Sequence, residues 1–401
     1  MTSRERVLAA LHHHTPDRVP LDIGGTESSG ITAMAANRLR RHLGLPPGRT
    51  QIFDVYQQIA KVEDDLRGLL GVDTVPLLIE PRAWKPFALP DGSPCEIPEK
   101  WCPEPDQRGD LVVRDDAGTV IARMPRDGFY FEPCAPSLAG VRSVAELDDH
   151  AEAIQSFDWP GFADESLDDI AARARRLFEE TDLAVVANLQ LHLLAAGQLL
   201  RGYETFMMDL MLDKPLAHAL LERLTQAYLA RAEAYLDRVA GCVQVVLCND
   251  DLGTQAGPML SPACYREMIW PYQRRLFQFI KEKSGAFLLL HSCGSVRAFI
   301  PALIEAGIDA LNPVQVSAAG MDTGELKAEF GERLTFWGGG CDTQRVLVRG
   351  TTAEVRDEVR RRVHDLSPGG GFVFTQVHNI QPDVPPENVV AMVEALREAG
   401  G

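Results

Sequence analysis

The sequence predicts an α/β protein built as a (β/α)₈ TIM barrel, with a β-hairpin insertion in its N-terminal half. Two observations support this prediction. Apolar runs of strand length alternate with helical periodicity along the C-terminal half, and such apolar runs number eight over the whole chain. Repeated strand–helix units place parallel strands inside a layer of helices, and eight parallel strands can close a barrel. A doubly wound open sheet of similar length is the alternative.

The eight predicted strands are short apolar runs, several of which end in glycine or in polar residues. In chain order they are RVPLDIG (18–24), VDTVPLL (72–78), LAVVANL (183–189), CVQVVLCND (242–250), AFLLLH (286–291), IDALNPVQ (308–315), LTFWGGG (334–340) and GFVFTQ (371–376).

Predicted helices follow the last five strands. Ser261 and Pro262 form a helix start, and apolar residues at helical spacing continue to Ile280 before Gly285 ends the run. Thr351 and Glu354 form a capping-box pattern. The remaining predicted helices span 295–307, 323–332 and 385–400.

One segment, residues 83–133, interrupts this alternation. It is rich in Pro, Gly and Asp, and GDLVVRDDAGTVIARM (109–124) contains two strand-like runs around Asp-Asp-Ala-Gly, a hairpin pattern. We therefore expect an antiparallel hairpin insertion over 83–133 within a single barrel domain that spans 1–401.

Composition restricts the class of partner. The net charge of −17 argues against nucleic acid or an anionic membrane as partner, because no basic stripe offsets it. No apolar run approaches the roughly 20 residues that cross a bilayer, and the N-terminal stretch lacks a signal-peptide core. The eight cysteines are scattered, without the spacing of a disulfide framework. We expect a cytoplasmic protein with reduced cysteines and a small-molecule or protein partner.

The ends of the predicted strands carry most of the candidate site residues, because chemistry in such barrels collects at the carboxyl ends of the strands. Asp250 and Asp251 are the candidate catalytic residues, and their place at a strand end favours this role over a helix cap or a solvated loop. The candidate substrate-binding residues are Asp22, Asn188, Gln255, Gln315, Asp342, Gln344 and Asn379.

Histidine and cysteine at three strand ends suggest a metal site. His291 and Cys293 are two residues apart on an extended backbone, so both side chains leave on the same face while Ser292 points away and tolerates substitution. Cys341 and His378 follow two later strands. Nitrogen and sulfur donors of this kind suit zinc, although a buried cysteine and a core histidine are also common. The third ligand is His378 or Cys341.

At these same residues the chain resembles the uroporphyrinogen decarboxylase superfamily, and within it the branch of zinc-dependent, corrinoid-linked methyltransferases. The matching stretches are RERVLAALHHHTPDRVP (4–20), DDLGTQAGPMLSP (250–262), LHSCGSVRAFIPALIEAGIDALNPVQ (290–315), FWGGGCDTQRVL (336–347) and GGGFVFTQVHNIQPDVPPENVVAMVEAL (369–396).

The resemblance implies a (β/α)₈ barrel and a zinc ion held by the His-X-Cys pair, here His291 and Cys293. The branch places a cysteine after the last strand, whereas this chain has His378 there, as the decarboxylases do. RVPLDIGGTESSG (18–30) stands where decarboxylases carry the arginines that grip porphyrinogen carboxylates.

The resemblance therefore favours a methyltransferase that moves a methyl group between a small methyl ether or thiol and a corrinoid cobalt. The corrinoid (cobalamin) is expected on a partner protein, and a homodimer is the default assembly. The alternatives are a metal-free decarboxylase-like lyase and a non-catalytic, ligand-binding member of the superfamily.

Overall fold

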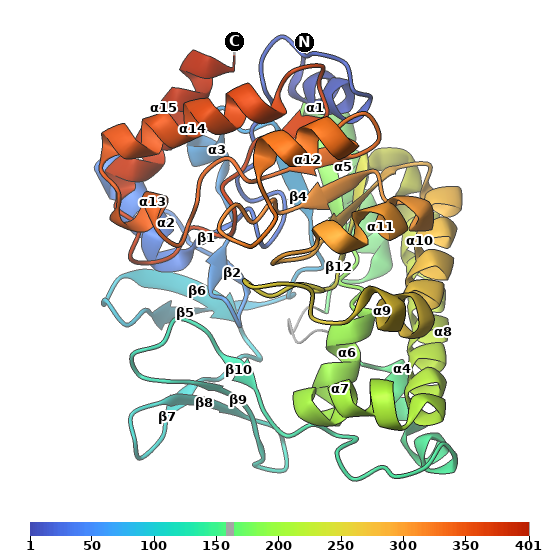
Figure 1. Cartoon of the computed structure of the whole chain (residues 1–401). Helices are drawn as coiled ribbons and strands as arrows, with labels where there is room; N and C mark the ends of the chain where they lie inside the picture. The colour runs from blue at the N-terminus through green and yellow to red at the C-terminus, as the bar shows by residue number, and fades with distance from the viewer. Residues whose placement is uncertain (158–163, 401) are drawn as a thin grey trace.

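The computed structural model of the chain describes residues 1–157 and 164–400, and its centre is a curled parallel sheet (Figure 1). The strand order is β16-β15-β14-β13-β12-β11-β4, and every neighbouring pair is parallel. Its strands are β4 (Thr74–Leu77), β11 (Ala184–Asn188), β12 (Val245–Asn249), β13 (Phe287–His291), β14 (Ala310–Asn312), β15 (Thr335–Trp337) and β16 (Phe372–Val373). Each lies inside a predicted apolar run, which confirms the α/β class and the parallel sheet.

The first predicted strand, 18–24, forms only a bridge in the structure. Leu21 pairs in parallel with Phe374, and the N–H of Asp22 donates to the Phe374 carbonyl at 2.8 Å. On the other side the N–H of Asp73, next to β4, donates to the Leu21 carbonyl at 2.8 Å. Pro20 has no N–H, and the N–H of Leu21 donates to the Asp73 side chain, so a regular ladder cannot extend. This segment therefore contacts both edges of the curled sheet.

Apolar side chains of the strands pack on both faces of the sheet. Val245 and Leu247 pack in one apolar cluster with α1 (Ser3–Leu11), whereas Val246 and Cys248 pack in a second cluster with the surrounding helices. Successive side chains of a strand point to opposite faces, which explains the two clusters.

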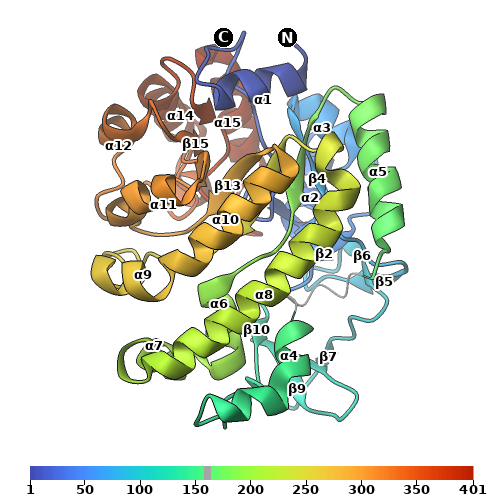
Figure 2. The same cartoon turned by 90° about the vertical axis from the view of Figure 1, so that its right-hand side faces the viewer.

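Helices surround the sheet, as Figures 1 and 2 show. They are α2 (Ala33–His42), α3 (Asp64–Leu70), α4 (Ala151–Gln155), α5 (Leu167–Glu180), α6 (Leu193–Arg201), α7 (Tyr203–Leu212), α8 (Lys214–Val239), α9 (Pro262–Met268), α10 (Trp270–Ser284), α11 (Ile300–Ala306), α12 (Thr323–Phe330), α13 (Val346–Arg349), α14 (Thr352–Leu366) and α15 (Pro386–Ala399), with 3₁₀ turns η1 (Ala145–His150), η2 (Ala240–Cys242) and η3 (Arg297–Phe299). No helix in the described part of the chain combines the length and the apolar character needed to span a bilayer.

Helix boundaries follow the capping residues, with one correction. Ser261 caps α9, and Thr351 with Glu354 forms the predicted capping box of α14. The sequence predicted one continuous helix from Ser261 towards Gly285, but the structure divides it into α9 and α10. Pro271 is the reason, because a proline inside a helix lacks the N–H that bonds to the preceding turn.

Antiparallel strands occupy the N-terminal half. One sheet contains β1 (Ile31–Thr32), β3 (Ile59–Ala60) and β2 (Ile52–Asp54). Two more lie within 83–133: β5 (Trp84–Ala88) pairs with β6 (Pro94–Pro98), and β7 (Glu104–Pro105), β8 (Leu111–Arg114), β9 (Val120–Met124) and β10 (Glu132–Pro133) form a four-stranded sheet. Figure 1 shows β7 to β10 at the bottom of the molecule, alongside α6 and α7.

Candidate active site

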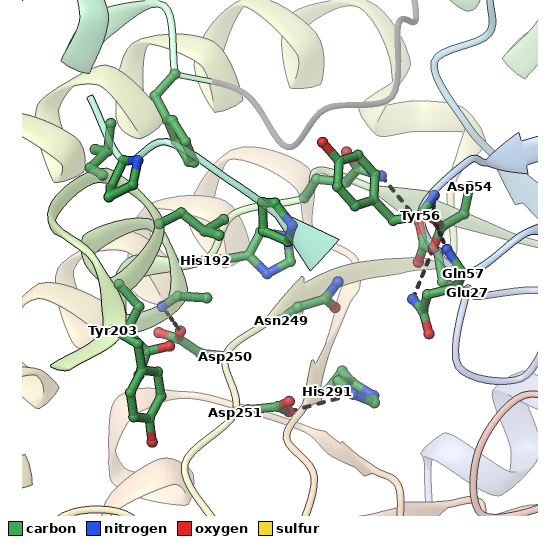
Figure 3. Close-up of a pocket in the computed structure, with 18 of the residues that line it drawn as sticks. Glu27, Asp54, Tyr56, Gln57, His192, Tyr203, Asn249, Asp250, Asp251 and His291 are labelled. Atoms are coloured by element: carbon green, nitrogen blue, oxygen red, sulfur yellow. Dashed lines mark hydrogen bonds and ion pairs between the residues drawn. The ribbon is translucent and has the colours of Figure 1, made fainter. Parts of the chain in front are cut away.

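A cavity of about 710 Å³ lies at the carboxyl ends of the sheet strands. Its walls come from the loops after the first sheet segment, β11, β12, β13 and β16, from α6 and α7, and from residues 121–157. Figure 3 shows ten labelled residues of its lining. The position agrees with the rule that parallel α/β sheets bind ligands at the carboxyl ends of their strands.

Three side chains of this region form a cluster that can hold a metal ion. His291 is the last residue of β13, Cys293 follows it by two positions, and His378 lies in the loop after β16. One ligand atom from each lies within 4.8 Å of the others. The distance between His291 Nε2 and Cys293 Sγ is 3.5 Å. Tetrahedral zinc with Zn–N and Zn–S bonds of usual length separates such atoms by about 3.6 Å, so the donor pair fits zinc.

Asn312, the last residue of β14, fixes which nitrogen of His291 faces the cluster. The Asn312 side-chain amide donates to the carbonyl of Trp337 at 2.9 Å, so its Oδ1 must act as acceptor. That oxygen lies 2.7 Å from His291 Nδ1 and also accepts from Ser28 Oγ at 2.6 Å. Nδ1 therefore carries the proton, and the lone pair of Nε2 faces Cys293. This arrangement of an outer hydrogen bond is typical of metal-binding histidines.

Burial controls the protonation of the other two cluster members. It lowers the pKa of His378 to about 4, with His291 as a second cause, so the imidazole is neutral at physiological pH and can donate its lone pair. It raises the pKa of the Cys293 thiol, and the nearby Asp251 carboxylate adds to that rise. A thiolate at Cys293 therefore requires a cation beside it, as a bound metal provides.

Asp251 lies beside the cluster. Its Oδ1 accepts from the backbone N–H of Cys293 at 2.8 Å and lies 3.6 Å from His291 Nε2. The Asp251 side chain is half exposed, and it lines the cavity with His291 (Figure 3). It thus holds the loop that carries Cys293 and presents a carboxylate next to the donor atoms.

Asp250 lines the same cavity, but protein groups occupy its carboxylate. Both oxygens accept from the N–H of Leu194, and Oδ1 also accepts from the N–H of Ala195, at the start of α6. Gln273 donates to Oδ2 at 2.9 Å. Burial raises the pKa of Asp250 to about 6. The structure therefore favours the capping role that the sequence offered as an alternative to catalysis.

None of the seven predicted substrate-binding residues is among the described residues that line this cavity, so their binding role stays a prediction. Asp22 is fully buried and accepts from Thr74, Trp337 and the N–H of Gly25. The others also bond within the protein: Asn188 to Glu27, Gln255 to Gln344, Gln315 to the N–H of Gly294, Asp342 to the N–H of Gln344, and Asn379 to Gln57 and Tyr130. These side chains position loops around the cavity.

Two further expectations concern Cys341 and Ser292. Cys341 is buried and stands outside the metal-binding cluster that the described residues form, so the geometry favours His378 as third ligand. Ser292 is not a tolerant position, because it is buried and its Oγ accepts from the N–H of Leu252 at 3.0 Å.

The sequence interpretation missed an acidic group at another wall of the cavity. Glu27 lies in the loop after the first predicted strand, and Asn188 and Gln190 both donate to its Oε1. Its Oε2 has no hydrogen-bond partner among residues 1–157 and 164–400. Burial, reinforced by the carboxylate of Asp54, raises the pKa of Glu27 to about 7. The strand-end rule indicated this loop, but nothing in its composition distinguished Glu27.

Comparisons with known proteins agree on the family. The family model for uroporphyrinogen decarboxylase (URO-D) matches residues 146–399. The chain is 29% identical over 195 residues to the uroporphyrinogen decarboxylase of Thioalkalivibrio sulfidiphilus. The aligned stretch covers 47% of this chain and 50% of that protein. It is 29% identical over 191 residues to the uroporphyrinogen decarboxylase of Pseudomonas fluorescens. That alignment covers 46% of this chain and 49% of the relative. The chain thus spans about half the length of these curated relatives.

A solved structure extends the likeness of fold to the whole chain. The methyltransferase from Methanosarcina mazei superimposes with a TM-score of 0.59 at 18% identity, covering 99% of each chain. At this identity the match concerns the fold alone. The family model covers well over half of the sequence, and on that evidence the chain belongs to the uroporphyrinogen decarboxylase family.

Proposed function

We propose that the protein is a zinc-dependent methyltransferase on a complete (β/α)₈ barrel, which moves a methyl group between a small methyl ether or thiol and a corrinoid cobalt. The observation that carries the proposal is the convergence of His291, Cys293 and His378 on one point, at which the two histidines line the cavity. The hydrogen bond from His291 to Asn312 supports it, because it directs the Nε2 lone pair to that point.

His291, Cys293 and His378 would hold the zinc ion, and three protein ligands leave a fourth position for substrate. The chemistry that bound zinc supplies is a lower pKa for a ligated thiol, or polarisation of an ether oxygen. Asn312 keeps the proton of His291 on Nδ1. Asp251 accepts from the N–H of Cys293 and places a carboxylate beside the three ligand atoms. The apolar part of the cavity wall includes Leu199 and Leu247 and would limit the access of water to a bound substrate.

The corrinoid is expected on a separate protein, and the surface beside the cavity supports such a partner. Tyr203 lines the cavity and is 57% exposed, and it begins α7, which also exposes Met208, Met211 and Leu212. An exposed apolar patch of this kind marks a place where another protein docks.

The name of the curated relatives suggests porphyrinogen decarboxylation as a second candidate. That substrate bears eight carboxylates and requires a cationic pocket. The described cavity lining contains Glu27, Asp54, Asp250 and Asp251 but neither lysine nor arginine. The charge of the cavity therefore favours the methyltransferase.

The proposal is tested by incubating zinc-loaded protein with cob(I)alamin and a panel of methyl ethers, and with methylcobalamin and a panel of thiols. The expected result is methyl transfer that requires corrinoid and is lost in Cys293→Ala. Glu358→Gln is the matched control, because Glu358 is buried on α14, outside the described lining of the cavity. Conversion of substrate with corrinoid excluded, or full activity in Cys293→Ala, would contradict the proposal.

A further inference from the structure

The electrostatic character of the cavity restricts the substrate more than the proposed function does. Four carboxylates line the described wall, and lysine and arginine are absent from it. Away from the zinc-binding cluster, the carboxylates of these walls repel an anion and attract a cation.

Glu27 gives this charge a specific location. The residue is 8% exposed and lines the cavity. Asn188 and Gln190 fix its Oε1, whereas Oε2 lacks a hydrogen-bond partner within the described residues. A buried carboxylate oxygen without a partner is costly for folding, and in the wall of a cavity a ligand can satisfy it.

Neighbouring groups strengthen the preference for a cation. Asp54 is buried near Glu27 and accepts from the N–H groups of Tyr56 and Gln57, so a second carboxylate lies beside the first (Figure 3). Asn249 also lines the cavity, and its Oδ1 is a second buried acceptor for which the described chain offers no donor.

Aromatic rings complete the environment. Tyr56, Phe157 and Tyr203 line the same cavity. The faces of aromatic rings attract alkylammonium ions, and such rings recur where proteins recognise quaternary ammonium groups.

We propose that Glu27 receives the ammonium group of the substrate, so that the substrate class is a small organic cation without a carboxylate, sulfonate or phosphate. Calling this ligand the substrate rests on the proposed function. The cation site itself depends only on Glu27 and its surroundings.

The test compares two probes of the same shape. Choline and its uncharged carbon isostere 3,3-dimethylbutan-1-ol differ only in a positive nitrogen that replaces a carbon, and neither is a strong zinc ligand. Calorimetric titrations of both, at millimolar concentrations and at a pH of about 8, where Glu27 is ionised, give the ratio of their dissociation constants. The variants are Glu27→Gln, which keeps the acceptor for Asn188 and Gln190, and the control Glu358→Gln.

The expected result is a preference of the wild type for choline of about tenfold or more. The ratio should fall towards one in Glu27→Gln and stay unchanged in Glu358→Gln. Equal binding of the two probes to the wild type, no binding of either, or an unchanged ratio in Glu27→Gln would overturn the proposal.

The zinc content of the same samples separates this inference from the proposed function. Cation preference in a protein that binds no zinc would refute the methyltransferase and leave the cation site standing. Zinc-dependent methyl transfer without cation preference would support the methyltransferase and refute the cation site.

Discussion

Replacing Glu27 by glutamine should stabilise the fold, because the native carboxylate is buried at a cost. Glutamine has nearly the same shape, and its Oε1 can still accept from Asn188 and Gln190. The pKa of Glu27 rises from 4.5 to about 7 in the folded protein. At about 1.4 kcal/mol per pH unit, ionising it in the fold costs roughly 3 kcal/mol.

The pH dependence of this stabilisation has a definite sign. Below a pH of 4.5 the glutamate is protonated in both the folded and the unfolded chain, so the variant gains nothing. Between 4.5 and about 7 the unfolded glutamate releases its proton while the folded one retains it, so the advantage of glutamine grows. Above about 7 both are ionised and the advantage is constant. For a chain of this length, roughly 3 kcal/mol corresponds to a rise in Tm of roughly 3 to 4 °C.

The assay is thermal unfolding of metal-free wild type and Glu27→Gln between mildly acidic and mildly alkaline pH. Glu358→Gln is the control, because Glu358 is equally buried but is paired with Arg362 at 2.9 Å. That variant removes the negative charge beside the buried Arg362 guanidinium and should lower Tm. A Glu27→Gln variant that is less stable than the wild type, or whose advantage does not change with pH, would refute the account of Glu27 as a functional, destabilising group.

Two further predictions concern residues that support the site. Asn312→Ala should weaken zinc binding by about 10- to 100-fold, because His291 loses the acceptor that fixes its tautomer; competition with a zinc chelator measures this, and an affinity equal to that of the control Ser28→Ala would contradict it. Asp250→Ala should destabilise the protein by about 2 kcal/mol, because two N–H groups of α6 lose their acceptor. Chemical denaturation compares it with Asp250→Asn, which retains an acceptor, and equal stability of the two variants would show that the cap is unimportant.

The parallel sheet could be predicted from sequence because its signal is local. Each strand is a short apolar run, and alternation within the run places Val245 and Leu247 on one face and Val246 and Cys248 on the other. The errors also have local causes. Pro20 reduces the first strand to a bridge, and Pro271 divides one helical pattern into α9 and α10.

The clustering of His291, Cys293 and His378 was predictable for a related reason. His291 and Cys293 are fixed to one face by the extended backbone at the end of β13, and His378 follows the last strand at the same edge of the sheet. The shared face of His291 and Cys293 and the position of His378 at the same edge both follow from the predicted order of the strands. The choice between His378 and Cys341 required coordinates, because both residues follow strands that end at this edge.

The rest of the site depends on contacts that no periodicity reveals. Asp22 and Asn379 stand at strand ends, yet loop geometry turns both towards protein partners. Glu27 and Asp54 come from the N-terminal half and meet at the cavity only through the fold. The role of Asn312 becomes visible only when its three hydrogen bonds are known together.

The central claim is that His291, Cys293 and His378 bind zinc. The most direct measurement is the zinc content, by mass spectrometry, of protein purified without chelator or immobilised metal, for the wild type and for Cys293→Ala, His378→Ala and Cys341→Ala. The account predicts near-stoichiometric zinc in the wild type and in Cys341→Ala, and its loss in the other two variants. A well-folded wild type that contains no zinc, or a Cys293→Ala variant that retains it, would contradict the account.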